Sequence, residues 1–338
     1  MKEIDHLKVS VIIPTYNRKD ELEKLLHSLN NQTLPPSQFE IIIVDDGSSD
    51  GTEEWLMKHK DQYSIEIFLY AQVHEGTGAA RNLGMEKARG DIFAFIDTDC
   101  VAHPEWLEHL MKPFHAEKVG AVGGSEVIND KDPLLMRCFH YLMTSPLTTG
   151  GLRGKRGRRL AHFYPRGFSM AISRKAYYST KKFRKIFHAY ADDIELSYLI
   201  KRKGYDLIYQ DSAKVYHRRR STLIQFVKQT FHMGKARITL ARLHPSSLEP
   251  LHTLPAFSIL FLFLLIPLSI CWPPVLIILE LYLGLGVLYL IIVAIDSALK
   301  LNSLKTFFLT PLLFILQQGA YGSGFLASLL SRKGENPT

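Results

Sequence analysis

The sequence is 338 residues long, which is enough for one sizeable catalytic domain with additional elements. Hydrophobic residues make up 46% of it, yet they crowd after residue 251 while charged residues crowd before residue 243, which excludes a single uniform globular domain. The three cysteines, Cys100, Cys138 and Cys271, are too few and too far apart for a disulfide framework or a paired-cysteine metal site, and they indicate a reducing cytosol.

The N-terminal part of the chain alternates short β-rich runs with amphipathic runs. Strands are predicted at residues 9–13, 40–44, 65–70 and 92–96, and helices at residues 21–29, 53–58 and 79–88. This alternation is typical of βαβ units on a largely parallel sheet, so the predicted fold class is α/β. Ligands bind such sheets outside the carboxyl ends of the strands. Polar residues follow the first, second and fourth predicted strands, at 14–18, 45–51 and 97–99.

Three long apolar stretches lie towards the C-terminus, at about residues 251–271, 274–299 and 304–330. Each approaches or exceeds the roughly 20 residues that span a bilayer. Lys235, Arg237 and Arg242 precede the first stretch, so the positive-inside rule places the large domain in the cytoplasm. We expect a multi-pass cell-membrane protein without a secretory signal at residues 1–8. Buried soluble helices are the alternative, and the glycines and glutamines of the third stretch also fit a tightly packed or re-entrant segment.

The middle of the chain is strongly basic. Residues 151–242 hold 23 of the 41 lysines and arginines but only 5 of the 33 acidic residues, which calls for an anionic neighbour. We favour membrane lipids over nucleic acid, because the basic segment runs directly into apolar stretches. Residues 223–237 mix apolar and basic side chains at helical spacing, as in a helix at the membrane interface. Residues 150–159 are predicted to form a mobile basic loop.

Asp97, Thr98 and Asp99 directly follow a strongly apolar predicted strand. Two carboxylates at a strand end suit Mg²⁺ or Mn²⁺ carrying a diphosphate. Such a pair alone is a weak signal, since a turn with two solvated carboxylates has the same sequence.

Three further motifs precede this pair in order. Residues 9–18 read VSVIIPTYNR, residues 44–52 read VDDGSSDGT and residues 78–84 read GAARNLG. Together with the aspartate pair they resemble the family 2 glycosyltransferases over residues 8 to about 237. The resemblance implies the glycosyltransferase A fold, with a Rossmann-like nucleotide-binding half and an acceptor half, and a nucleotide-sugar donor with Mn²⁺ or Mg²⁺.

The resemblance also assigns roles in donor binding. Residues Pro14, Thr15 and Tyr16 would line the nucleotide pocket, and Asp45 or Asp46 would accept a hydrogen bond from the base, which favours uracil or guanine over adenine. The Arg81 guanidinium would fork onto a phosphate or a base carbonyl. The remaining donor contacts would come from Asp97 and Thr98.

The acceptor half carries three more pieces of the pattern. Residues 165–170 read PRGFSM, so Arg166, Gly167 and Phe168 resemble the family's glycine-containing loop near the donor sugar; many relatives have Asn in place of Ser169. Residues 192–196 read DDIEL, where Asp192 replaces the usual Glu. In this motif Asp193 would be the general base of an inverting transfer, whereas capping of the following helix is the simpler role for Asp192. By the same resemblance His217 would join Asp97 and Asp99 as a metal ligand.

The predicted organisation has four parts. Residues 1–220 form the catalytic domain, with residues 1–100 as the nucleotide-sugar half and 101–220 as the acceptor half. Residues 221–250 form an amphipathic interfacial segment, 251–330 an all-α membrane domain of about three helices, and 331–338 a tail. The predicted reaction transfers one sugar from a UDP- or GDP-sugar to a hydroxyl or phosphate of a lipid-linked or membrane-proximal acceptor. A processive polysaccharide synthase and a non-catalytic membrane scaffold are the alternatives.

Overall fold

The computed structural model describes residues 8–150, 162–180, 182–184, 187, 190–218 and 222–331. Contacts divide the chain into two compact units. The first comprises residues 1–129 and 162–218, and the second comprises residues 130–161 and 219–338. Nearly all of the predicted basic loop at 150–159 and most of the predicted tail lie outside the described residues.

The first unit is built on an eight-stranded mixed sheet in the order β3-β2-β1-β4-β7-β6-β8-β5. Strands β1, β2, β3 and β4 run parallel, β6 is parallel to β8, and β7 and β5 run antiparallel to their neighbours. The strands are β1 (Val9–Thr15), β2 (Phe39–Asp45), β3 (Glu66–Ala71), β4 (Ile92–Ile96), β5 (Cys100–Ala102), β6 (Val119–Val127), β7 (Ser169–Ser173) and β8 (Asp206–His217).

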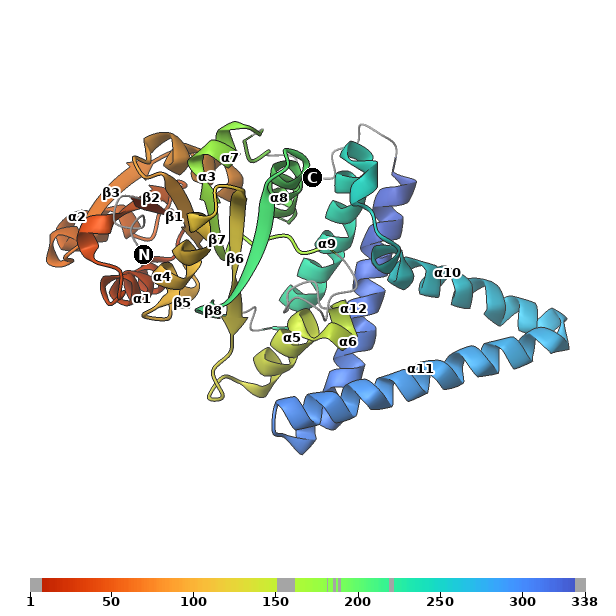
Figure 1. Ribbon diagram of the computed structural model, residues 1–338. Coiled ribbons are helices and arrows are strands. Elements are labelled where there is room, and N and C mark those ends of the chain that lie inside the picture. The colour runs from red at the N-terminus through yellow and green to blue at the C-terminus, as the bar shows by residue number, and fades with distance from the viewer. Residues whose placement is uncertain are drawn as a thin grey trace. The chain divides into compact units, whose positions relative to one another are not determined.

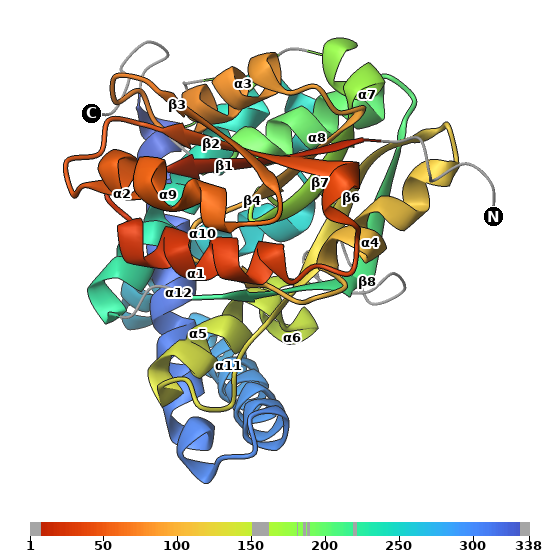
Figure 2. The same ribbon diagram turned by 90° about the vertical axis from the view of Figure 1, so that its left-hand side faces the viewer.

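Helices cover both faces of this sheet, because its central strands are apolar on both sides. Val11 and Ile13 point to a core shared with α1 and α4, whereas Ile12 points to a second core shared with α3, α7 and α8. Figure 2 shows α3 and α8 on one side of the sheet and α1 on the other. The helices are α1 (Lys19–Asn30), α2 (Thr52–His59), α3 (Thr77–Lys87), α4 (Trp106–Met111), α7 (Arg174–Tyr178) and α8 (Asp192–Arg202), with short 3₁₀ turns at Pro36–Gln38, Lys60–Gln62 and Lys112–His115.

The predicted strands and helices of the N-terminal part are confirmed, with shifts of one or two residues at their ends. The α/β fold class with a following all-helical region is confirmed as well. The elements that the sequence left unassigned lie mostly in residues 101–220, the predicted acceptor half, where β7 inserts antiparallel between β4 and β6.

The described part of the second unit is all helical. Among its described residues, three helices are long and apolar enough to cross a membrane: α10 (Pro250–Cys271), α11 (Pro273–Lys300) and α12 (Leu304–Leu330). Helices α10 and α11 expose many large apolar side chains, such as Phe263 and Ile270, which suits a lipid environment. The other helices are α5 (Leu134–Thr144), α6 (Pro146–Thr149) and α9 (Leu223–Leu243), with a 3₁₀ turn at Pro245–Ser247.

Helix α12 is continuous and lies alongside α9 (Figure 1). Glycines make this contact close: a Cβ at Gly234 would lie 2.1 Å from the carbonyl oxygen of Tyr321, and one at Gly324 would lie 2.0 Å from that of Phe231. Small residues allow helix backbones to approach in this way. The tight packing considered for the third apolar stretch is therefore present, and it buries one face of the basic helix α9.

Candidate active site

Strand pairing brings the sequence motifs to one edge of the sheet. Parallel β1, β2 and β4 end at Thr15, Asp45 and Ile96, so the polar residues that follow them meet at that edge. Antiparallel β7 pairs Ser169 with Ile96, so residues 166–168 lie beside residues 97–99. Strand β5 pairs Cys100 with His217 of β8, which brings that histidine to the same place.

The residues predicted to bind the nucleotide include the buried end of β1 and the exposed ring of Tyr16. Pro14 and Thr15 are buried in β1, and the Thr15 hydroxyl has no hydrogen-bond partner among the described residues. The Tyr16 ring is 43% exposed and stacks on His74 with their centroids 4.1 Å apart. Thr98 is buried between the two aspartates. An unsatisfied hydroxyl beside an exposed ring can bind a polar, planar ligand.

The two aspartates after β2 have different partners. Asp46 accepts from the side chain of Gln72 and from the backbone N–H of Gly76, at 2.6 Å and 2.8 Å, so it holds the loop before α3. Asp45 accepts from the Ser48 N–H at 2.9 Å through Oδ1. Its Oδ2 accepts no hydrogen bond within the described parts of the chain. Of the two, Asp45 is the carboxylate that can still accept from a base.

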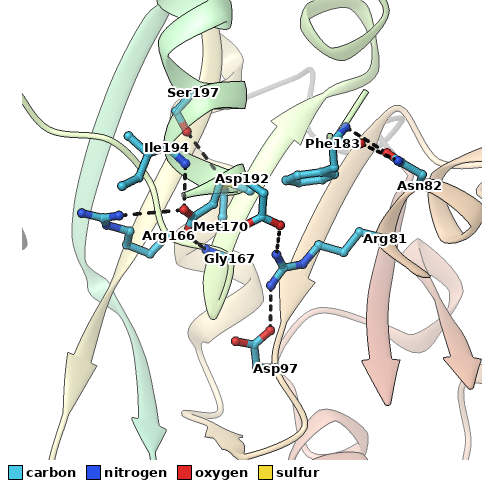
Figure 3. A network of polar contacts seen from close by, with 11 residues as sticks. Arg81, Asn82, Asp97, Arg166, Gly167, Met170, Phe183, Asp192, Ile194 and Ser197 are labelled. Atoms are coloured by element: carbon cyan, nitrogen blue, oxygen red, sulfur yellow. Dashed lines mark hydrogen bonds and ion pairs between the residues drawn. The ribbon is translucent and has the colours of Figure 1, made fainter. Parts of the chain in front are cut away.

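Arg81 joins two carboxylates at the centre of the site (Figure 3). Its Nη2 donates to Asp97 at 2.9 Å and its Nη1 donates to Asp192 at 3.1 Å. The arginine is buried, stacks on Phe183, and leaves so little space beside Gly167 that a Cβ there would lie 2.4 Å from Nη2. The sequence predicts that the two terminal nitrogens of this guanidinium bind a phosphate or a base carbonyl. In the structure they donate to Asp97 and Asp192 and orient these two carboxylates.

Asp193 lies next to this network at the start of α8. The backbone N–H of Gly167 donates to its Oδ2 at 3.0 Å, and Arg166 Nη1 lies 3.8 Å from its Oδ1. Helix α8 has Ala191 as its N-cap, which makes no side-chain capping bond, but Asp193 Oδ1 accepts from the N–H of Ile194 in the first turn at 2.7 Å. This first-turn N–H is therefore bound by Asp193 and not by Asp192. The last acidic residue of the motif, Glu195, is buried against Arg184 and has a structural role.

Asp99 and His217 form the candidate metal site. His217 Nε2 lies 3.2 Å from Asp99 Oδ1, and the ligand atoms of Asp99, Cys100 and His217 all lie within 4.8 Å of one another. An oxygen and an imidazole nitrogen suit Mn²⁺. Burial, together with the nearby carboxylates, raises the pKa of the Cys100 thiol well above its usual range, so this thiol is a weaker ligand than the other two. Asp97, the third predicted ligand, is turned towards Arg81.

Two groups of the site have shifted pKa values. Burial lowers the pKa of His217, but the carboxylates of Glu126 and Asp99 outweigh this effect and raise it to about 9. Burial raises the pKa of Asp192 to about 6, although the positive charge of Arg81 opposes the shift. Groups with strongly shifted pKa values are typical of active sites.

The sequence did not indicate Glu126, Arg18 or Trp106 as site residues. The buried carboxylate of Glu126 on β6 lies 3.2 Å from His217 Nδ1, and Arg18 Nη1 lies 3.1 Å from Asp99 Oδ2. Trp106 donates its indole N–H to the Ser169 hydroxyl at 2.9 Å, so in this chain Ser169 binds a buried indole. Arg18 ends the first motif and could have been suspected, but Glu126 has no local signal. Next to the candidate metal site, the Phe168 ring stacks on His217 with the two ring centroids 5.1 Å apart.

The sequence and fold match known glycosyltransferases. Glycosyltransferase AglE from Haloferax volcanii is 40% identical over 117 residues, which are 35% of this chain and 38% of the relative. Validoxylamine A glucosyltransferase from Streptomyces hygroscopicus subsp. limoneus is 34% identical over 103 residues, 30% of this chain and 23% of the relative. The chain thus spans well under half the length of these relatives.

A solved structure has the same fold over nearly the whole chain. It is that of the mannosyltransferase PcManGT from Pyrobaculum calidifontis in complex with GDP-Man and Mn²⁺, which is 18% identical, has a TM-score of 0.68, and is matched over 97% of this chain and 88% of its own. The model of glycosyl transferase family 2 matches residues 10–187, which is more than half of the sequence. The chain belongs to glycosyl transferase family 2.

Proposed function

We propose that this glycosyltransferase moves one sugar from a UDP- or GDP-sugar to a hydroxyl or phosphate oxygen of a lipid-linked or membrane-proximal acceptor, with inversion at the anomeric carbon. The observation that carries the proposal is the position of Asp193. Its carboxylate is held by the Gly167 N–H at 3.0 Å, next to the network in which Arg81 orients Asp97 and Asp192. A fixed carboxylate at the centre of the site is what a general base requires.

The reaction with a hydroxyl acceptor balances with one proton transfer. The acceptor oxygen forms a bond to the anomeric carbon, the bond from that carbon to the diphosphate breaks, and the hydroxyl proton moves to a carboxylate oxygen of Asp193. Because attack comes from the face opposite the leaving group, the configuration inverts and no covalent intermediate is needed. A phosphate acceptor that is already fully ionised needs no base.

Asp99 and His217 would hold a divalent cation, Mn²⁺ or Mg²⁺, with Asp97 as a further ligand once it turns from Arg81. The bound cation supplies positive charge that offsets the charge developing on the diphosphate. Glu126, on the other ring nitrogen, fixes the orientation of the imidazole. Arg18 keeps the Asp99 carboxylate oriented from the opposite side.

The donor would lie along Thr15, Tyr16 and Asp45. The free Oδ2 of Asp45 would accept the ring N–H of uracil or guanine, a group that adenine lacks at that position. A thermal-shift panel of UDP- and GDP-sugars with Mn²⁺ tests this assignment, because a ligand that binds only the folded state raises its stability. An ADP-sugar that stabilises as strongly as the others would contradict the role of Asp45.

The membrane arrangement is part of the proposal. Helices α10, α11 and α12 would each cross the cell membrane, with the catalytic domain of residues 1–220 cytoplasmic and residues 221–250 as its interfacial segment. The three long apolar helices support membrane association, and the basic residues before α10 support this orientation. Protease accessibility of the catalytic domain in intact and inverted vesicles tests it.

The base assignment is tested with Asp193→Asn. We expect kcat to fall by about 10²- to 10⁴-fold with little change in the KM for the donor, since that is the usual contribution of a general base. Asp61→Asn is the matched control, because it removes the same charge from an exposed position outside the site. An Asp193→Asn enzyme that transfers to a hydroxyl acceptor at the wild-type rate would refute the assignment.

Product length separates single transfer from polymer synthesis. Labelled nucleotide-sugar should give a product extended by one sugar at the earliest time. A polymer at the earliest time would instead identify the protein as a processive polysaccharide synthase.

A further inference from the structure

A cavity lies among the helices of the second unit. It has a volume of about 510 Å³ and is lined by residues of α5, α6, α9, α10, α11 and α12. This volume is within the range of about 300–1,000 Å³ that is usual for small-molecule sites. Most of the wall is apolar, and two of its side chains, Leu254 and Tyr289, are 56% and 39% exposed. The wall therefore offers apolar surface to a ligand with a hydrocarbon chain.

One buried positive charge faces this cavity. Arg237 of α9 is only 8% exposed, and its Nη1 has no hydrogen-bond partner among the described residues. None of the described residues that line the cavity is an aspartate or a glutamate. An isolated buried charge costs several kcal/mol unless it is paired. The described residues provide no anion to pair with Arg237, so an anionic ligand would have to provide it.

Neutral polar groups accompany the arginine in the wall. Gln317 of α12 donates to the carbonyl oxygen of Leu142 at 3.3 Å, while its Oε1 has no partner in the described structure. His252 of α10 accepts from the Glu249 N–H through Nδ1 at 3.1 Å, so in the neutral ring the proton is on Nε2. The cavity thus combines the Arg237 guanidinium with an acceptor, Gln317 Oε1, that can bind a hydrogen-bond donor of a ligand.

We propose that this cavity binds a phosphate monoester at the end of a lipid chain. The phosphate forms an ion pair with Arg237. The phosphate O–H, or a hydroxyl next to it in the ligand, donates to Gln317 Oε1, and the first part of the hydrocarbon chain packs against the apolar wall. An inorganic anion would satisfy the arginine but leave the apolar surface in contact with water, so both parts of the ligand contribute. The proposal goes beyond the proposed transfer reaction, because binding requires neither donor nor Asp193.

The test uses the full-length protein, freed of lipid by detergent exchange, with dodecyl phosphate as the probe and no nucleotide-sugar. Dodecanol lacks the phosphate and inorganic phosphate lacks the chain, so both should bind much more weakly. Arg237→Met should weaken dodecyl phosphate by about 10- to 100-fold, the effect of losing a hydrogen bond between charged groups. Lys228→Met is the matched control, since it removes one exposed positive charge from the same helix.

Thermal unfolding without ligand separates binding from a structural role. If Arg237 is an unpaired buried charge, Arg237→Met should unfold at the same or a higher temperature than the wild type. A lower unfolding temperature together with unchanged dodecyl phosphate affinity would overturn the proposal, as would equal binding of dodecanol. Farnesyl phosphate and phosphatidic acid distinguish the source of the lipid: tighter binding of the first indicates a single-chain carrier, and tighter binding of the second a resident phospholipid.

Discussion

The contact between Gly167 and Arg81 gives the sharpest test of the active-site network. In Gly167→Ala the new Cβ would lie 2.4 Å from Nη2 and 2.7 Å from Cζ of Arg81. Because carbon contacts are favourable at about 3.5–4.0 Å, the guanidinium or the loop must move by about 1 Å. Movement of the guanidinium breaks its 2.9 Å and 3.1 Å bonds to Asp97 and Asp192, and movement of the loop draws the Gly167 N–H away from Asp193.

Either movement displaces a group that the proposed reaction uses. A displacement of about 1 Å costs about 100-fold in rate, so we expect kcat of Gly167→Ala to fall by that order in a nucleotide-sugar transfer assay. One bond to a charged group contributes about 1.5–3 kcal/mol, so the unfolding temperature should fall as well. Gly78→Ala is the control, since its Cβ would lie at an ordinary 3.5 Å from Asp192 and should leave the rate about unchanged.

A double-mutant cycle identifies the clash as the cause. Removing the arginine side chain with Arg81→Ala removes the atoms that the new methyl group meets, so adding Gly167→Ala should cost little further stability. Thermal unfolding of the four proteins measures this coupling. Additive losses in the cycle, or a fully active Gly167→Ala enzyme, would refute the reasoning.

Three other predictions follow from the same site. Glu126→Gln should weaken Mn²⁺ binding by about 10- to 100-fold in a Mn²⁺ titration, because it loosens the imidazole of His217. The pKa of His217 is raised from 6.5 to about 9, so the stability that its positive charge contributes in the metal-free protein is complete below pH 6.5 and is lost as the pH rises through 9. Mn²⁺ requires the neutral ring, so its affinity should increase from pH 6.5 to 9; a flat profile would contradict this, and His217→Ala should remove the dependence. Ser169→Ala leaves the buried indole N–H of Trp106 unpaired and should lower the free energy of unfolding by about 1–3 kcal/mol in a denaturant titration, whereas an unchanged value would show that the bond is replaced.

The strands that the sequence predicted correctly are those with local signals. The apolar run before Asp97 marks β4, and turn residues after β1 and β2 mark the edge of the sheet where the candidate site lies. These signals need only neighbouring residues, so the βαβ half and the order of its motifs could be predicted. The family resemblance added roles for residues in the acceptor half, although it did not reveal what each side chain contacts.

The contacts that complete the site join residues far apart in the chain. Arg81 and Asp192 are 111 residues apart, and they meet only because α3 and α8 cover the same face of the sheet. Glu126 reaches His217 because β6 pairs with β8, a neighbour that no local pattern specifies. Propensity and periodicity do not encode which strands pair, so these partners required the structure.

The burial of Arg237 has the same kind of cause. Helical spacing in α9 indicates a helix that mixes basic and apolar residues, but it does not say which face another helix will cover. Which face is covered depends on Gly234, because the absence of a side chain there lets the backbone of Tyr321 on α12 approach the α9 backbone closely. A residue counted among the basic residues before the first span thus becomes a buried charge in the helical unit.

The start of α8 explains how two adjacent aspartates serve different purposes. Successive residues of a helix point about 100° apart, so Asp192 and Asp193 cannot face the same partner. Asp192 faces Arg81 and balances its charge in the buried core, while Asp193 faces the loop that contains Gly167. The two oxygens of Asp193 accept from the backbone N–H groups of Gly167 and Ile194, at 3.0 Å and 2.7 Å, so this carboxylate is oriented by the backbone and not by the arginine. The order of the two residues therefore decides which of them is bound by Arg81, and in the proposed reaction it is the other one, Asp193, that serves as the base.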